Sequence, residues 1–597
     1  MSIIINAIEK RMNNRLTMSV VIILCAGWLF FIFANPLATI NDFWWHIATG
    51  RYIFENGQLP EIDPFSQVTR DTVNPREKGI LQGYWLAQLI YFGFYKLLGW
   101  WGLIVLKSGI FTSIVLILLK LLRNKRVAFP LAIFAILPLA LFGSNYVPLR
   151  PHGFTFLGVA LLLYFLEKIP GEKDKKNFNL TKSISLPMIM IAWGNLHPGY
   201  IIGIAVLLIY GVAESYRFIK SWKNTRMTRS KEFFQTMGVL SFSILVSFIN
   251  PNHFSLLIDY LLMLMDLSSQ NRSDHFMQNI TEYFTPWRYA EIYGTYFDFY
   301  GLVLTALIFG GVLFIFRKHL KLEHFLLFVA FSLAGLYIYR FSIVFIIIAI
   351  SIGGQYLAYL QGSYAKRMNY VASGAVLIAV MFSIPTGYQR SVLRLGVFDT
   401  VLPVRAVDHI KKNNLPGPIL HPYEWGGYFI WRLYPDYRVF IDSRTLNDEA
   451  HSDYKKIGLN DEKSTWELFD KYNFNTVAYY YFIPGIDNIA GSFLIYLLRN
   501  PDWVITYLDR KSVIFSKKSL AIGVNIIDRT IFGKHVMSVL HSKMRANPGN
   551  PNSYFMAGLF SYALHDNITA LKYLNHAKKI TPGLNGLNYW IRRVMTE

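Results

Sequence analysis

Cysteine is almost absent from this sequence. Only one of the 597 residues is a cysteine, Cys25, and it lies inside an apolar run near the N-terminus. A single thiol excludes disulfide bonds within the chain and metal sites that need several cysteines. No two histidines have the His-x-x-x-His spacing that places two ligands on one helix face. A divalent metal ion held by Asp42 with His46, His197 and His253 stays an open alternative.

Acidic residues are also scarce. The chain has 59 Lys and Arg against 37 Asp and Glu, a formal net charge of +22. In a soluble protein such an excess suggests nucleic-acid binding. Here the basic residues gather in short loops between apolar runs, so we interpret them as residues that set membrane topology and contact anionic lipids. Nucleic acid is not expected as a partner.

Apolar side chains are abundant instead. The chain is 53% hydrophobic and 16% aromatic, which is too apolar for an ordinary soluble protein of this length. A bilayer crossing needs roughly 20 apolar residues, and about eleven runs approach that length. The predicted fold class is therefore an α-helical polytopic membrane protein. The runs fall near residues 18–37, 101–122, 127–145, 153–168, 184–196, 199–215, 233–249, 297–316, 323–339, 341–360 and 369–386.

Charge sets the expected orientation of these spans. Basic clusters precede the first run and occur at residues 123–126, 168–182, 217–231 and 317–321. All of them lie in the cytoplasm only if the N-terminus is cytoplasmic and everything after the last span lies outside. No small-residue cleavage site follows the first run, so no cleavable signal peptide is expected. The expected location is the cell (inner) membrane.

The run Gly79–Gly99 does not fit this alternation. Counting it as a span would place the basic residues at 123–126 outside. We therefore interpret it as a helix that lies on the outer leaflet, with tyrosines and Trp85 at headgroup depth. One more span is the alternative.

The sequence predicts three domains. Residues 1–388 would form the transmembrane domain, with a long first extracytoplasmic loop at 38–100. Residues 389–530 have ordinary soluble composition, with short apolar strands predicted at 418–420, 438–441, 476–481 and 512–515 between helical patterns, which favours a small α/β domain. Residues 531–597 contain one helix-turn-helix pattern of the tetratricopeptide kind.

Ionisable residues near the predicted span ends are concentrated on the outer side. Asp42 follows the first span and stands beside Trp44 and Trp45, which would desolvate its carboxylate and raise its proton affinity. Such an acid suits a general base. Cations on the same side could stabilise a phosphate leaving group. The candidates for phosphate or substrate binding are Arg150, Arg340, His197, His46, Lys78, Glu77, Trp45, Glu282, Arg288 and His253.

Structural roles are equally available to several of these residues. Asp42 could cap a helix or pair with Arg51, and His46 could be a satisfied interfacial histidine. His197, in the turn Asn-Leu-His-Pro-Gly, could only stabilise the chain reversal. Arg150 and Arg340 are costly at membrane depth without an anion, which favours phosphate binding.

The first loop resembles a known family. Asp42 begins the pattern D-x₅-A-x-G-R-x-I-x₃-G-x₂-P-x₂-D-P-F-S, and REKGILQGYWLAQLIYFGFYKLLG follows it. This is similar to the polyprenyl-phosphate-dependent glycosyltransferases of the C superfamily, which include protein O-mannosyltransferases and aminoarabinose transferases. The resemblance implies that Asp42 serves as catalytic base or metal ligand and that Glu77-Lys78 precedes an interfacial helix. Phe43 stands where the family often has a second acid.

The sequence therefore predicts a membrane glycosyltransferase that moves a sugar from a polyprenyl-phosphate donor to a glycan, lipid or protein acceptor on the extracytoplasmic face. No phosphate-binding glycine loop is present, which argues against a nucleotide sugar as direct donor. A transporter or flippase of lipid-linked glycans, and a non-catalytic scaffold for envelope glycan assembly, are the alternatives. No cofactor is expected with certainty.

One further motif stands out in the soluble part. HPYEWGGYFIWRLYPDYRVFIDSR contains Gly426-Gly427 and places Asp442 and Arg444 after a predicted strand. Polar residues at that end of a strand can bind ligands. A structural ion pair between the two is the other interpretation.

Overall fold

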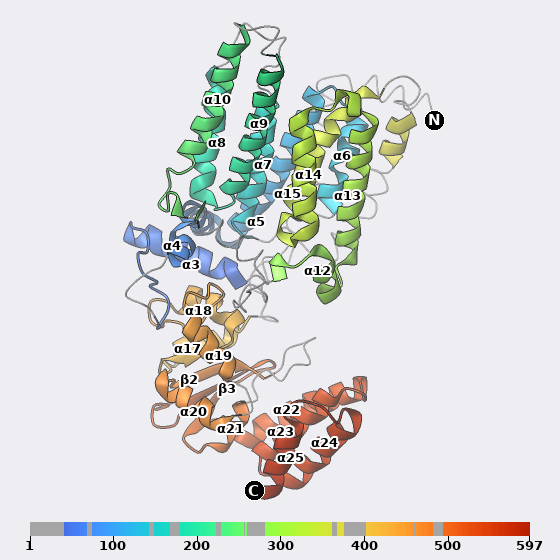
Figure 1. Ribbon diagram of the computed structural model, residues 1–597. Coiled ribbons are helices and arrows are strands. Elements are labelled where there is room, and N and C mark those ends of the chain that lie inside the picture. Colours follow the sequence, from blue (N-terminus) through green and yellow to red (C-terminus); the bar gives the residue numbers. More distant parts are fainter. Residues whose placement is uncertain are drawn as a thin grey trace. The chain divides into compact units, whose positions relative to one another are not determined.

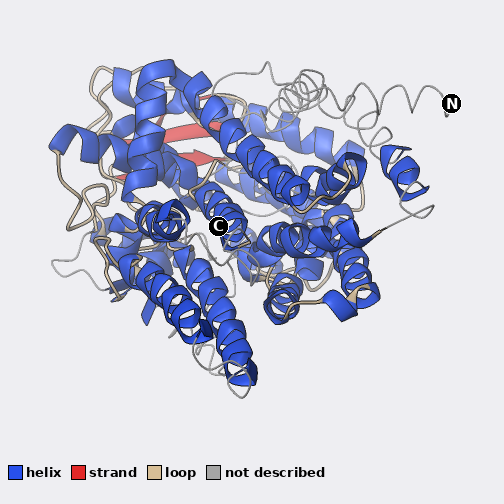
Figure 2. Ribbon diagram, turned by 90° about the horizontal axis from the view of Figure 1, so that it is seen from above, coloured by secondary structure: helices blue, strands red, loops and turns tan. Residues whose placement is uncertain are grey.

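The computed structural model describes residues 41–68, 75–141, 149–167, 180–221, 228–255, 257–258, 281–360, 367–374, 402–457, 461–481 and 493–597. The chain divides into two compact units. The helical unit holds residues 1–37, 49–59 and 74–396, and the C-terminal unit holds residues 38–48, 60–73 and 397–597. Helices dominate, and the described strands belong to one small sheet (Figure 2). Two stretches of the first loop are thus counted with the C-terminal unit.

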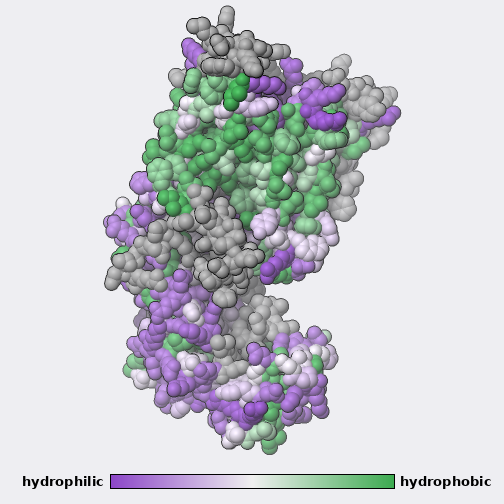
Figure 3. Space-filling view, in the orientation of Figure 1, coloured by the Kyte–Doolittle hydropathy of each residue, from purple (hydrophilic) through white to green (hydrophobic). Residues whose placement is uncertain are grey.

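Apolar helices build the helical unit (Figure 1). Among the residues that the structure describes, four helical stretches are long and apolar enough to cross a membrane: Glu77–Asn124, Tyr200–Ser221, Tyr296–Ile315 and Tyr339–Tyr359. Hydrophobic side chains accordingly cover much of the visible surface of this unit (Figure 3). The helices are α4 (Pro75–Gln82), α5 (Trp85–Asn124), α6 (Phe129–Leu141), α7 (His152–Leu166), α8 (Leu180–Leu196), α9 (Tyr200–Ser221), α10 (Thr228–Val246), α12 (Pro286–Tyr293), α13 (Tyr296–Ile315), α14 (Leu322–Tyr337) and α15 (Ser342–Ile348).

These helices occupy the apolar runs of the sequence. The predicted span 18–37 lies outside the described residues, as does most of 369–386. α7 is buried on nearly all sides and packs against α5 and α8, which makes it a central helix of the unit. Short polar turns delimit others: the Thr285 hydroxyl accepts a hydrogen bond from the backbone N–H of Arg288, Pro286 begins α12, and Gly294 ends it at φ 68°.

The predicted surface helix Gly79–Gly99 is separate from the span that follows it. α4 ends at Gln82, and α5 is interrupted at Gly99, where φ is 58° and ψ is −143°. The segment 85–98 is therefore one helix and 100–124 another. Its placement on the outer leaflet stays a prediction.

A four-stranded mixed sheet lies in the C-terminal unit. Its strands are β1 (Ile419–Leu420), β2 (Thr476–Tyr480), β3 (Trp503–Leu508) and β4 (Ser512–Lys517), in the order β1-β2-β4-β3. Only the β1–β2 pair is parallel. The predicted strand at 438–441 was wrong as a full strand. Val439 forms isolated bridges to Ile419 and to Ser66 of the first loop, because β1 offers a partner of only two residues. The strand β3 was not predicted.

Helices surround this sheet and complete the unit. They are α17 (Val404–Lys412), α18 (Gly426–Leu433), α19 (Asp448–Lys456), α20 (Glu462–Lys471), α21 (Leu494–Arg499), α22 (Arg529–Ala546), α23 (Pro551–Ala563), α24 (Asn567–Ile580) and α25 (Leu587–Thr596). Side chains of Asp528, Asn550 and Asp566 accept hydrogen bonds from the first turns of α22, α23 and α24. One hydrophobic core runs from Leu420 to Val594.

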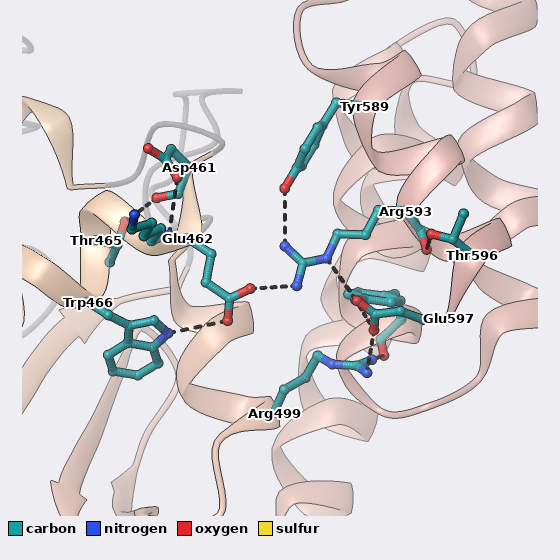
Figure 4. A network of polar contacts seen from close by, with 11 residues as sticks. Asp461, Glu462, Thr465, Trp466, Arg499, Tyr589, Arg593, Thr596 and Glu597 are labelled. Carbon is teal, nitrogen blue, oxygen red and sulfur yellow. Dashed lines mark hydrogen bonds and ion pairs between the residues drawn. The ribbon is translucent and has the colours of Figure 1, made fainter.

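A polar network joins the last helix to the sheet region within this unit (Figure 4). Arg593 of α25 donates to the Glu462 carboxylate of α20 at 2.5 Å, and Arg499 donates to Glu597 at 2.8 Å. Together with the shared core, these contacts make residues 402–457, 461–481 and 493–597 parts of one compact unit.

Candidate functional site

A charged cluster lies at the N-terminal end of α7. Arg150, two residues before the helix, forms an ion pair with Glu282 of the short helix Thr281–Tyr283. Both side chains are mostly buried, with 19% and 28% of their surfaces exposed. Burial alone would raise the pKa of the Glu282 carboxyl, but Arg150 and Arg340 outweigh it and hold that pKa below its usual range. Glu282 is therefore an anion held between two guanidinium groups.

Arg340 supplies the second cation. It lies in the short helix Tyr339–Phe341 between α14 and α15, and its Nη1 donates to the Tyr283 hydroxyl at 3.1 Å. Its Nη2 contacts His152 Nε2 at the first residue of α7. Among the described residues, this cluster thus combines two guanidinium groups with one carboxylate. Such an excess of positive charge suits an anionic ligand.

His197 borders this cluster. It occupies the turn between α8 and α9, is 2% exposed, and its ring centroid lies 4.7 Å from that of His152. Burial, followed by the positive charge of Arg340, lowers the pKa of His197 well below its usual value. His197 is accordingly neutral at physiological pH.

Hydrogen bonds fix the orientation of this ring. Its Nδ1 lies 2.8 Å from Thr155 Oγ1 of α7 and 2.7 Å from the backbone nitrogen of Gly199. Trp193 Nε1 of α8 donates to Thr155 Oγ1 at 3.1 Å. A Cβ on Gly199 would lie 2.2 Å from Thr155 Oγ1, so this close approach requires glycine. The turn Asn-Leu-His-Pro-Gly thus places the ring as well as reversing the chain.

Asp42 belongs to the C-terminal unit. It lies in the first turn of α3 (Asn41–Asn56) and is half-buried, followed by the buried side chains of Phe43, Trp44, Trp45 and His46. Trp44 packs edge-on against Tyr428 with 5.0 Å between ring centroids.

The HPYEWGGY motif lies close to Asp42. Burial raises the pKa of the Tyr423 hydroxyl, and the negative charges of Asp442, Asp42 and Glu424 raise it further. These three carboxylates therefore surround one tyrosine of the motif. A side chain at Gly426 would collide with Ile441 O and Asp442, so the motif's first glycine lets α18 start against that segment.

Asp442 and Arg444 form a buried ion pair, in agreement with the structural interpretation. Arg444 donates to both oxygens of Asp442 at 2.7 Å, and also to both oxygens of Asp63 at 2.7 and 3.0 Å. Its side chain is 1% exposed. Since Asp63 comes from the first loop, Arg444 fastens that loop to the C-terminal unit.

The other candidate residues are spread over the structure. Glu77 is buried in the first turn of α4, and the neighbouring Lys78 is exposed. Arg288 is exposed on α12, with its guanidinium 4.3 Å from the Phe284 ring centroid. His253 is exposed in the turn after α10.

The histidine–aspartate metal alternative finds no support in the part of the chain that the structure describes. Within these residues, no three His, Cys, Asp or Glu side chains come together in a group that could hold a metal ion.

Four residues of the cluster were not named as ligands from the sequence. These residues are His152, Thr155, Trp193 and Tyr283. The spacing of His152 and Thr155, three residues apart at the start of an apolar helix, places both on one helix face and could have indicated a polar site there.

The similarity of this chain to known proteins is one of structure. No family model and no curated protein matches the sequence. The oligosaccharyltransferase of Archaeoglobus fulgidus in complex with Zn and sulfate is 11% identical, with a TM-score of 0.53 over 95% of this chain and 86% of that chain. The fold of this chain is therefore similar to that of this oligosaccharyltransferase.

Two further solved structures are also similar to this chain. The archaeal oligosaccharyltransferase AglB from Archaeoglobus fulgidus, in complex with an inhibitory peptide and a dolichol-phosphate, is 10% identical, with a TM-score of 0.52 over 96% of this chain and 87% of that chain. ArnT from Cupriavidus metallidurans bound to undecaprenyl phosphate is 12% identical over 86% of this chain and 100% of that chain, with a TM-score of 0.48. At such identity the likeness concerns the fold. The GT-C-like fold and the membrane-length helices indicate an integral membrane protein.

Proposed function

We propose that this protein is a membrane glycosyltransferase that transfers a sugar from a polyprenyl-phosphate donor to an acceptor on the extracytoplasmic face. The observation that carries the proposal is the cluster at the start of α7, where Arg150 pairs with Glu282 and Arg340 lies near enough to lower the pKa of the same carboxyl, within a GT-C-like fold. Two guanidinium groups beside an apolar helix suit the phosphate of a lipid. The archaeal enzyme of the same fold was solved with a dolichol-phosphate, which supports this donor class.

In the proposed reaction the acceptor oxygen attacks the anomeric carbon of the sugar. The bond from that carbon to the phosphate oxygen breaks, and its electron pair leaves with the phosphate, where Arg150 and Arg340 would stabilise the charge. Asp42 would take the proton from the acceptor. His46 and Trp45, which are buried next to Asp42, would shape its surroundings.

The topology and domain assignments are part of this proposal. The N-terminus would be cytoplasmic, about eleven helices would cross the inner membrane, and the segment before Gly99 would lie on the outer leaflet. Residues 389–530 and 531–597 would both be extracytoplasmic and would place the acceptor. The pair α23–α24 would act as a tetratricopeptide-like unit, consistent with the close approach of Gly558 to Leu574.

The test compares the purified wild type with Asp42→Asn on a mixed pool of polyprenyl-phosphate sugars, analysed by mass spectrometry. We expect the wild type to consume a donor and Asp42→Asn to bind it while turning over at least about 100-fold more slowly, in the range of lost general-base catalysis. Equal turnover by both proteins would remove Asp42 from the chemistry. Binding without turnover by either would favour a flippase or a scaffold.

A further inference from the structure

The cluster at α7 contains a histidine whose proton can be placed from its neighbours. A backbone N–H only donates, so the 2.7 Å contact from Gly199 N identifies His197 Nδ1 as an acceptor. The indole Nε1–H of Trp193 also only donates, and it donates to Thr155 Oγ1. The hydroxyl proton of Thr155 is therefore free to point to His197 Nδ1, 2.8 Å away. Both contacts leave the ring proton on Nε2.

The other nitrogen of this ring has no such contact. His197 Nε2 is buried and has no hydrogen-bond partner among the described residues. A buried donor without an acceptor is costly and rare in folded proteins. His152 and Arg340 lie beside the ring, so the vacant donor belongs to the positively charged cluster.

We propose that Thr155, Gly199 and Trp193 hold His197 in the neutral form with its proton on Nε2, and that this N–H donates to an anionic oxygen of the phosphate that Arg150 and Arg340 attract. The identity of the ligand rests on the proposed function; the tautomer does not. Thr155 and Trp193 are positioning residues, because they act on the ligand only through His197.

A neutral donor has a specific consequence for recognition. His197 adds a directed hydrogen bond to the cluster without adding a third positive charge beside Arg150 and Arg340. It would therefore select an oxygen at one position, whereas the guanidinium groups attract any anion. This arrangement suits a phosphate group that must keep one orientation while its sugar is removed.

Two amide substitutions separate the nitrogens of the ring. His197→Asn keeps a polar atom near the Nδ1 position and loses the one at Nε2; His197→Gln keeps an amide N–H near the Nε2 position. With undecaprenyl phosphate as probe, we expect His197→Asn to bind about tenfold more weakly than wild type, the effect of one hydrogen bond to a charged group, and His197→Gln to bind within about threefold. The reverse order would overturn the proposal.

The positioning residues have their own matched variants. Thr155→Val removes the hydroxyl and should weaken undecaprenyl phosphate binding about threefold to tenfold, whereas Thr155→Ser should bind like wild type. The ionisation of the probe is the same for every variant, so it cancels in the ratio of affinities. In the double variant Thr155→Val with His197→Asn, the threonine effect should vanish. An undiminished effect would show that Thr155 acts independently of His197.

The tautomer itself can be observed without any ligand. Nitrogen-15 NMR distinguishes protonated from unprotonated imidazole nitrogens, and the difference between wild type and His197→Gln assigns the signal. A protonated Nε2 with an unprotonated Nδ1 is expected, and a proton on Nδ1 would overturn the inference. Wild type that shows this tautomer but binds no polyprenyl phosphate would overturn the proposed donor and leave the positioning by Thr155 and Trp193 standing.

Discussion

The two ends of α7 both hold buried charges, but they are matched differently. At the C-terminal end, the Glu167 carboxylate accepts hydrogen bonds from Lys125 at 2.7 Å and from the Tyr210 hydroxyl at 2.8 Å. The same carboxylate also contacts Lys321 and His324. His324 in turn contacts the Tyr356 hydroxyl at 2.9 Å. The carboxylate is thus surrounded by donors.

The N-terminal end shows the opposite balance. There two arginines share Glu282, and His197 presents a buried N–H without a partner among the described residues. The 15 residues of α7 separate the two clusters by roughly 22 Å of helix. A buried network whose groups satisfy each other serves the fold, whereas one with unused donors and excess charge is poised for a ligand. The comparison therefore sets charges that stabilise the fold against charges that we propose to bind a ligand, at the two ends of one helix.

The largest expected effect is a loss of stability from a substitution at the C-terminal end of α7. Glu167→Gln should lower the stability of the protein by about 3 kcal/mol, because it removes the buried carboxylate that pairs with Lys125. The half-exposed Lys321 contributes little to this loss, since water screens it. Thermal unfolding in detergent measures the effect. Binding of undecaprenyl phosphate by the folded fraction should be unchanged, and a loss of binding equal to that of an arginine variant would abolish the distinction.

The next effect concerns the cationic end. Arg340→Gln should weaken undecaprenyl phosphate binding about 30-fold, the value of a charge-assisted hydrogen bond of about 2 kcal/mol. Its unfolding temperature should stay close to that of wild type, because removing one of two neighbouring cations also removes repulsion. Arg317→Gln, on an exposed arginine at the start of the segment between α13 and α14, serves as the control. Strong destabilisation of Arg340→Gln would instead mark Arg340 as structural.

The stability of the protein should depend on pH through His197. The pKa of His197 is lowered by burial and by Arg340, so below about pH 6.5 the unfolded chain takes up a proton that the folded protein excludes. Stability should therefore fall with decreasing pH by up to about 1.4 kcal/mol per unit. His197→Gln should lack this part of the slope.

The smallest effect has the opposite sign. Glu282 competes with a ligand for Arg150, so Glu282→Gln should tighten undecaprenyl phosphate binding about threefold while lowering stability. Isothermal titration at low and at moderate salt measures both affinity and its salt dependence. Weaker binding by this variant would mean that Glu282 contacts the ligand or its acceptor directly.

Hydropathy predicted the helices well, because membrane-length apolar runs leave few other structures for the backbone. The C-terminal unit was harder. The residues Arg438–Ile441 look like a strand, yet Val439 makes only bridges, since its partners are a two-residue strand and Ser66 of the distant first loop. Pairing across more than 300 residues leaves no local signal.

The candidate residues of the α7 cluster were visible in the sequence as separate outward polar groups. The free-energy cost of an arginine at membrane depth indicated Arg150 and Arg340 as binding residues. The turn Asn-Leu-His-Pro-Gly drew attention to His197. Their partners were not predictable, because Arg150 meets Glu282 across 132 positions and Arg340 meets His152 across 188. Which nitrogen of His197 carries the proton depends on the Thr155 hydroxyl and the Gly199 N–H, and no residue pattern encodes that contact.

The interruption of α5 has a consequence for how the chain meets a bilayer. As one straight rod, its 40 residues would measure about 60 Å, twice the thickness of a hydrocarbon core. The φ of 58° and ψ of −143° at Gly99 lie in a region that is essentially open to glycine alone. One residue without a side chain therefore lets the 25 residues that follow match the membrane by length, while the segment before it takes its own direction.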